Sequence, residues 1–394
     1  MKKLILCLIL LPSLGWAQLS PFEVSGYIKD MVSTFKFPFL DKRLNEELVH
    51  ARLNSRWYPA EPLVASLEVR FRAIYGSSVE KIPNYLDQIK SHHEFEQLDA
   101  VLWNRRKTIG YAQIDRLWLD YTSGNLEMTL GRQRIAWGTA LVWNVIDLFN
   151  PQSILDFDYE EKPGADAIRL QYYTGAVTKV ELAAKPGKSK DRTIVAGLFS
   201  INAFGYDFYG MAGIRSNRWL AGAAWAGAIR KAGFRGEVLI SEAPKQKSYP
   251  PFPYLFLPGS ESFGTKNPAV NAVLSADYTF SNSLYIHTEL LYNNNGVSRN
   301  AGLLYWQALQ LGMLSPARWS IYQEFSYDIT PLIRGSVFAI HNPDDKSSIV
   351  VPYLTWSLAE NLDLTILSFL SSGKRFTEYG DYGTSFFLRL KYSF

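Results

Sequence analysis

The sequence predicts an all-β fold: one transmembrane, antiparallel, up-and-down β-barrel that closes on itself. In its last ten residues, side chains alternate between an apolar face and a wet face, as they do along a half-buried strand. The apolar face carries Phe386, Leu388, Leu390, Tyr392 and Phe394; the wet face carries Ser385, Arg389, Lys391 and Ser393. Mean hydropathy is −0.09, and no run of roughly 18 apolar residues follows residue 17. Because only helices and closed barrels satisfy backbone groups in lipid, a membrane-spanning chain of this kind must be a barrel.

The N-terminus reads as a secretory signal peptide over residues 1–17. Lys2 and Lys3 precede an apolar stretch at 4–14, and Gly15-Trp16-Ala17 forms a small-x-small cleavage site. We therefore expect one domain, a barrel over 18–394. The only cysteine, Cys7, lies within the signal, so disulfides and Cys-bound metals are excluded from the mature chain and no cofactor is expected.

Period-two patterning of about ten residues, interrupted by turn signals, recurs along the rest of the chain. We predict 18 strands, with a count of 16 left open because 191–241 is rich in Gly and Ala and weakly patterned. The predicted strands are 22–36, 47–58, 63–75, 111–122, 126–135, 165–173, 177–185, 191–201, 205–214, 217–227, 231–241, 268–279, 283–291, 317–328, 331–341, 347–357, 361–370 and 383–394.

The connections alternate between short turns and longer segments, which predicts short periplasmic turns and long outer loops, with both termini on the periplasmic side. The longer segments are 76–110, 135–164, 242–267, 292–315 and 371–382. Aromatic residues make up 14% of the chain, which suits interfacial girdles. A formal net charge of only +4 implies no nucleic-acid partner. A secreted β-sandwich is the alternative fold.

The segment Gly131-Arg132-Gln133-Arg134-Ile135-Ala136-Trp137-Gly138 ends one predicted strand and enters a loop. This pattern and the terminal strand resemble Gram-negative porin-like outer-membrane barrels, including phosphate-selective and uncharacterised porin-like families. The resemblance implies a transport channel in the outer membrane rather than an enzyme. It also implies contacts with outer-membrane lipid and lipopolysaccharide, and recognition of Phe394 by the barrel-assembly machinery.

Arg132 breaks the alternation of its strand, because Leu126, Met128 and Leu130 would place it toward lipid. A bulge at Gly131 would turn Arg132 into the lumen, and glycine tolerates a bulge well. The alternative is that Arg132 lies among lipid headgroups above the apolar band.

The loop 139–164 is apolar in its first half and acidic in its second half. Apolar side chains are stabilised by burial and not by exposure to water, so we expect the loop to fold inward against the barrel wall. The alternative is that the loop forms an outer cap. The residues assigned to this constriction are Trp137, Trp143, Asp147, Asp156, Asp158, Glu160 and Glu161.

A second group is basic and faces inward on strands that become neighbours when the barrel closes. Together with Arg132, it forms the predicted pore-lining selectivity set: Arg52, Arg56, Arg70, Arg72, Arg389 and Lys391. A basic wall facing an acidic loop would set a transverse field across the pore and select ions. The alternative is an ordinary polar lumen in which these charges pair with Glu68 or others.

These features together predict a porin-like passive channel for small hydrophilic, anionic solutes. The alternatives are a non-conducting structural, assembly or surface-polysaccharide-associated barrel, and a transporter of hydrophobic solutes. A hydrolase would need an outward-facing Ser–His pair, whereas His50 and His287 fall on inward faces. Monomers and homotrimers share the same strand pattern.

Overall fold

The computed structural model describes residues 21–90, 94–150, 155, 158, 160–188, 192–243 and 263–394. The predicted signal peptide and its cleavage site lie outside these residues.

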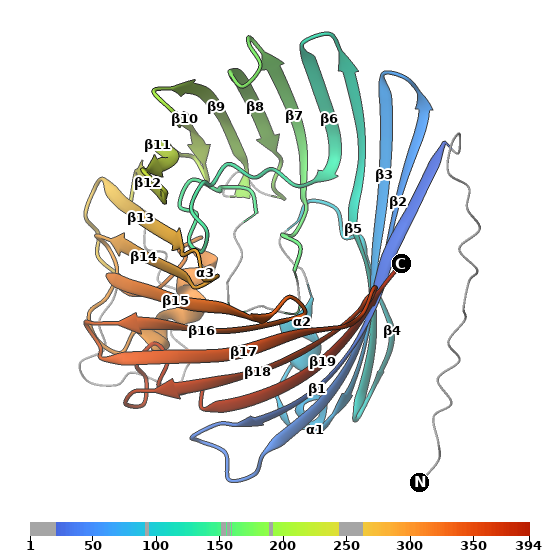
Figure 1. The fold of residues 1–394 in the computed structure, drawn as a ribbon, viewed down its shortest axis with the longest axis vertical. Helices are drawn as coiled ribbons and strands as arrows, with labels where there is room; N and C mark the ends of the chain where they lie inside the picture. The colour runs from blue at the N-terminus through green and yellow to red at the C-terminus, as the bar shows by residue number, and fades with distance from the viewer. Residues whose placement is uncertain are drawn as a thin grey trace.

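Eighteen antiparallel strands form a closed barrel, as the sequence predicts (Figure 1). Each strand pairs with the next along the chain, and β19 pairs with β1, so the wall has no free edge. The wall strands are β1 (Phe22–Lys36), β2 (Leu44–Ala60), β3 (Leu63–Gly76), β5 (Thr108–Ser123), β6 (Leu126–Gln133), β7 (Ala165–Tyr173), β8 (Lys179–Lys185), β9 (Ile194–Ala203), β10 (Tyr206–Arg215), β11 (Arg218–Ile229), β12 (Ala232–Ser241), β13 (Ala269–Thr279), β14 (Tyr285–Asn293), β15 (Trp319–Thr330), β16 (Ile333–Asn342), β17 (Ser347–Ala359), β18 (Leu362–Ser372) and β19 (Thr384–Ser393).

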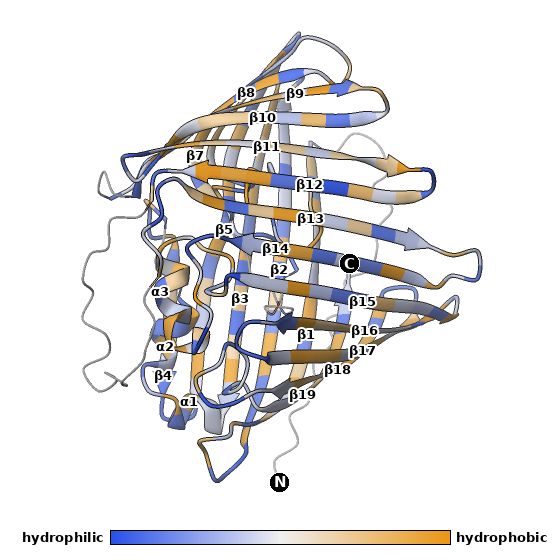
Figure 2. Ribbon diagram, turned by 90° about the vertical axis from the view of Figure 1, so that its left-hand side faces the viewer, coloured by the Kyte–Doolittle hydropathy of each residue, from blue (hydrophilic) through white to orange (hydrophobic). Residues whose placement is uncertain are grey.

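The terminal strand closes the barrel through backbone hydrogen bonds. Gly26 and Phe394 exchange two N–H···O bonds of 2.9 Å, which ties the last residue to the start of β1. Apolar residues on its outer face remain exposed, among them Leu388, Leu390 and Tyr392. Figure 2 shows the same alternation of apolar and polar residues along strand after strand. The apolar outer surface suits lipid.

One further strand, β4 (Asp99–Arg105), was not predicted from the sequence. It pairs with the Thr108–Gln113 half of β5, while β6 pairs with the Leu117–Ser123 half. Because β4 satisfies the backbone groups of β5 next to its outer end, β6 can stop at Gln133. The chain is then free to leave the wall and enter the barrel.

Short helices belong to the connections at the end of the barrel that carries the long loops. They are α1 (Ser77–Lys81) and α2 (Tyr85–Ile89) between β3 and β4, and η2 (Ala301–Leu304) and α3 (Tyr305–Gln310) between β14 and β15. No helix among the described residues is long and apolar enough to cross a membrane.

Candidate functional site

The segment that follows β6 crosses the inside of the barrel, toward β11–β14 (Figure 1). We call residues 134–164 the inward loop. Its apolar residues pack into one buried cluster with side chains of the opposite wall, such as Met211, Leu239 and Tyr322. The buried loop residues are Ile135, Trp137, Ala140, Trp143, Val145, Ile146, Leu148 and Phe149. The predicted inward fold is therefore present, and burial of these side chains explains why an apolar loop is stable there.

Three wall glutamates, Glu181 of β8, Glu237 of β12 and Glu289 of β14, hold the inward loop on this side. All three side chains are fully buried. Glu181 accepts a hydrogen bond of 2.6 Å from the indole N–H of Trp137. We call these three residues the anchor glutamates; the sequence patterns gave them no role.

Glu237 and Glu289 each accept three backbone N–H groups of the inward loop. Glu237 accepts those of Thr139, Ala140 and Ile146, the second at 2.8 Å and the third at 3.2 Å. Glu289 accepts the next consecutive run, from 141 to 143, at 2.7, 3.0 and 3.0 Å. A buried carboxylate can only accept hydrogen bonds, so converging backbone donors are its natural partners. The anchor glutamates thus satisfy loop donors that would otherwise be buried without acceptors.

The acidic half of the loop lies on the opposite side, on a group of cations that we call the basic wall: Lys29, Arg52, Arg389 and Lys391. Glu160 lies 3.0 Å from the Arg389 guanidinium and 2.7 Å from the Lys391 ammonium. Asp158 lies 3.3 Å from Lys29 and 2.9 Å from His50. Glu161 accepts a 3.0 Å hydrogen bond from Tyr27. The inward loop is therefore fastened to both sides of the lumen.

This contact corrects the predicted transverse field. The acidic loop does not face the basic wall across a pore; it sits on that wall and neutralises it. Arg52 is further paired with Asp115 at 2.6 Å and with Glu68, two residues of its own wall. The sequence pattern places Arg52, Arg389 and Lys391 on the inward face, but it does not single out Lys29 or show that the loop itself is their partner.

The other predicted basic residues lie in different surroundings. Arg70 is buried and donates to Gln113 at 2.8 Å, and Arg72 donates to the Ile89 carbonyl oxygen at 2.7 Å. Arg56 is exposed.

Arg132 does not occupy the position expected from a bulge at Gly131. β6 pairs with β5 and β7 without a register shift there. Arg132 is buried and forms a double contact with Asp166, at 2.6 and 2.9 Å, and a 2.6 Å bond to the Glu96 carbonyl oxygen. It clamps the segment that leads into β4, so it is neither a free lumen charge nor an exposed headgroup contact.

The remaining predicted loop residues are also placed, apart from Asp156, which lies outside the described residues. Trp143 is buried and meets Tyr322 edge to face, with ring centroids 6.3 Å apart. Asp147 is buried and pairs with Lys162 at 2.7 Å. Burial raises the pKa of Asp147, and Lys162 opposes that shift.

Ionisation of the acidic half follows from its partners. Burial alone would raise the pKa of Asp158, but the hydrogen bond from His50 and the charge of Lys29 hold that pKa below its usual range. The pKa of Glu160 is also lowered, because Lys29, Lys391 and Arg389 outweigh its burial. Both carboxylates are therefore charged at neutral pH, as the contact with the basic wall requires.

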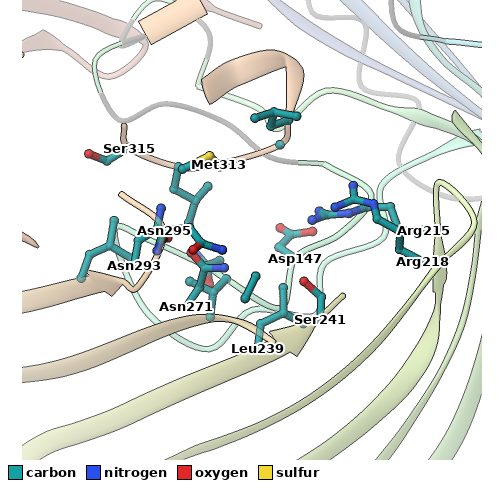
Figure 3. Close-up of a pocket in the computed structure, with 17 residues that line it drawn as sticks. Asp147, Arg215, Arg218, Leu239, Ser241, Asn271, Asn293, Asn295, Met313 and Ser315 are labelled. Carbon is teal, nitrogen blue, oxygen red and sulfur yellow. Dashed lines mark hydrogen bonds between the residues drawn. The ribbon is translucent and has the colours of Figure 1, made fainter. Parts of the chain in front are cut away.

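A recess lies where the inward loop meets the long-loop end of the barrel (Figure 3). The empty space between its lining residues, open solvent included, is about 720 Å³. Arg215 and Arg218 lie on one side of it, and Asn271, Asn293 and Asn295 lie on the other. Asp147 of the inward loop and the segment 311–315 also line it. The sequence patterns did not single out the two arginines.

A buried carboxylate, Glu378, lies among the loops near this recess. It accepts hydrogen bonds from Ser315 at 2.8 Å and Asn342 at 3.0 Å, and its own N–H donates to Asp345 at 2.7 Å. Burial and the neighbouring Asp345 raise the pKa of Glu378 from 4.5 to about 7. Glu378 therefore links its own loop to the β14–β15 and β16–β17 connections. The strength of this link depends on whether the carboxyl group of Glu378 is protonated.

We predict that the loop 373–383 becomes less stable as pH rises from about 5 to about 8. The folded-state pKa is raised above the unfolded value, so the folded form keeps the proton that the unfolded form loses between pH 4.5 and 7. Hydrogen exchange of 373–383, corrected for the intrinsic rate, should be slower at pH 5.5 than at pH 8. Glu378→Gln, a neutral isostere, should remove the difference; an equal difference in this variant would contradict the assignment.

The fold is that of outer-membrane porins. The structure resembles Pseudomonas aeruginosa OccK9 (OpdG), with 11% identity, a TM-score of 0.59, and coverage of 94% of this chain and 98% of that one. It also resembles Acinetobacter baumannii OccAB3 (9%, TM-score 0.58, 95% and 100%). A third neighbour is the outer membrane protein OprD of Pseudomonas aeruginosa (8%, TM-score 0.55, 95% and 94%). The predicted outer-membrane location agrees with these likenesses. No family model and no curated protein matches the chain.

Proposed function

We propose that the chain is a porin-like passive channel of the outer membrane for small hydrophilic solutes, with a preference for anions. The observation that carries the channel is the inward loop, fastened to the anchor glutamates on one side and to the basic wall on the other. The preference for anions is the finer part of the proposal, and the reversal potential in a salt gradient tests it separately. A loop fixed in this way narrows a lumen while leaving its transport passive, so no energy source is needed. The porin fold supports the same function.

Recording from the purified protein in planar bilayers tests this proposal. We expect stepwise current increments that are stable with time at constant voltage. Insertion without current would contradict the channel and favour the structural or assembly barrel. A hydrophobic-solute transporter is less well supported, because the apolar residues of the inward loop pack against the wall instead of lining a path.

One observation favours a second function, hydrolysis at the outer surface. His341 and Ser348 form a 2.8 Å hydrogen bond across β16 and β17, and His341 alternates with buried Ile340 and Asn342, so it faces outward. A nucleophile and base in contact are two parts of a catalytic triad. Within the described part of the chain, the second ring nitrogen of His341 has no orienting partner. Ester hydrolysis by the purified protein that Ser348→Ala abolishes would establish this activity, and no hydrolysis would reject it.

A further inference from the structure

The recess beside the inward loop carries two arginines that form no ion pair with a described residue. Arg215 and Arg218 are paired across the two-residue turn between β10 and β11, so the two side chains lie next to each other. Both point into the recess (Figure 3). Among the described residues, no carboxylate lies within ion-pair distance of either guanidinium, and Arg218 only donates to the Glu242 carbonyl oxygen at 3.3 Å. This differs from the basic wall, where the inward loop supplies the counter-charge.

Two adjacent guanidinium groups repel each other unless an anion bridges them. Arginine presents paired N–H donors that match the oxygens of a carboxylate or a phosphate. Gly312 leaves room for this: a side chain there would come within 3.3 Å of the Arg215 guanidinium, and the φ of +70° favours glycine. The arginine side of the recess is thus suited to one oxyanion group.

The recess also offers polar groups with unused hydrogen-bonding capacity. Among the residues described, the side chains of Asn144, Ser241 and Asn271 form no hydrogen bond with another residue. Within the described part of the chain, no hydrogen bond of ordinary geometry reaches the buried Oδ1 oxygen of Asp147. This carboxylate oxygen can only accept hydrogen bonds, and it would repel a second anionic group. Its suitable partner is therefore a hydroxyl group of the bound molecule. The apolar side chains of Leu239, Leu291 and Met313 line the remainder.

We propose that this recess is a solute-binding site for small hydroxylated organic oxyanions, placed at the long-loop side of the inward loop. Arg215 and Arg218 bind the oxyanion, while Asn271, Ser241 and Asp147 bind the hydroxyl groups of its carbon skeleton. The proposal deepens the proposed anion-preferring channel and rests on it. It also moves the charge that attracts the solute from the basic wall to the opposite side of the barrel.

Calorimetric titration of the full-length, detergent-solubilised protein tests the site without relying on current. The probes share one skeleton length: gluconate and sorbitol 6-phosphate carry an oxyanion with hydroxyls, sorbitol lacks the anion, and hexanoate lacks the hydroxyls. We expect binding of gluconate or sorbitol 6-phosphate, at least about tenfold tighter than binding of sorbitol or hexanoate. The tighter of the two identifies the oxyanion as carboxylate or phosphate.

Arg215→Gln/Arg218→Gln should weaken this binding about tenfold or more. The matched control, Arg43→Gln/Arg106→Gln, changes two exposed arginines at the same end of the barrel and should leave it unchanged. Asn271→Ala provides a milder test, which should weaken gluconate binding but not hexanoate binding. No binding of either oxyanion probe, equal binding of hexanoate, or binding that survives the arginine changes would overturn the site. Absence of ionic current with intact binding would instead reject the channel and keep the site.

Discussion

Glu237→Gln/Glu289→Gln should raise the single-channel conductance and its noise, because the inward loop loses its hold on the β12–β14 side. In each carboxylate, both oxygens accept loop N–H groups. Replacing one oxygen by an amide nitrogen leaves at least one backbone donor per position without an acceptor. Hydrogen bonds to a charged group contribute roughly 1.5–3 kcal/mol each. The double change should therefore destabilise the attachment of the inward loop to the wall by about 3–6 kcal/mol.

The matched control for this experiment is Glu360→Gln, which changes an exposed glutamate in the turn between β17 and β18. It should leave both conductance and noise unaltered. Deleting residues 141–160 is the more drastic form of the same test and should give a larger conductance. If neither the double variant nor the deletion changes the current, the inward loop does not constrict the lumen.

Asp158→Asn/Glu160→Gln should make the channel more anion-selective and the protein less stable. The changes remove the counter-charges of Lys29, Arg389 and Lys391. The Lys29 side chain is fully buried, and removing one partner of a buried ion pair typically costs about 3–5 kcal/mol. The cations that stay behind then act on passing ions without the charges of Asp158 and Glu160.

Reversal potentials in a salt gradient and thermal unfolding measure the two effects of this variant. Glu47→Gln, on an exposed position of β2, serves as the control and should shift neither quantity. An unchanged reversal potential together with normal unfolding would mean that the acidic half of the loop does not neutralise the basic wall.

The wall of the barrel could be predicted from the sequence because the burial pattern of each strand is visible as alternation among its own residues. Alternation in 383–394 and 63–75 depends only on neighbouring residues, and all 18 predicted segments overlap a wall strand. β4 was not predicted, since Ala100-Val101-Leu102-Trp103 is a short apolar run without alternation. Its partner, the outer half of β5, has the pattern of a strand whichever neighbour it pairs with.

The candidate site was predictable only in part, for a related reason. Trp143 and the acidic residues of the loop were recognisable by their composition, but the path of the loop depends on backbone N–H groups that meet Glu237 and Glu289. Every residue except proline has a backbone N–H, so the sequence does not reveal which of them bind these glutamates. Arg215 falls between the predicted strands 205–214 and 217–227, and Arg218 falls at the start of the second, where arginine is ordinary. Their significance comes from the loop segments that meet around them.

The reversal potential of the unmodified protein in a planar bilayer with a KCl gradient tests the central claim most directly. A passive channel with the proposed charge arrangement should conduct, and its reversal potential should lie on the anion-selective side of zero. A reversal potential on the cation-selective side, or a membrane that carries no current after insertion, would contradict the account.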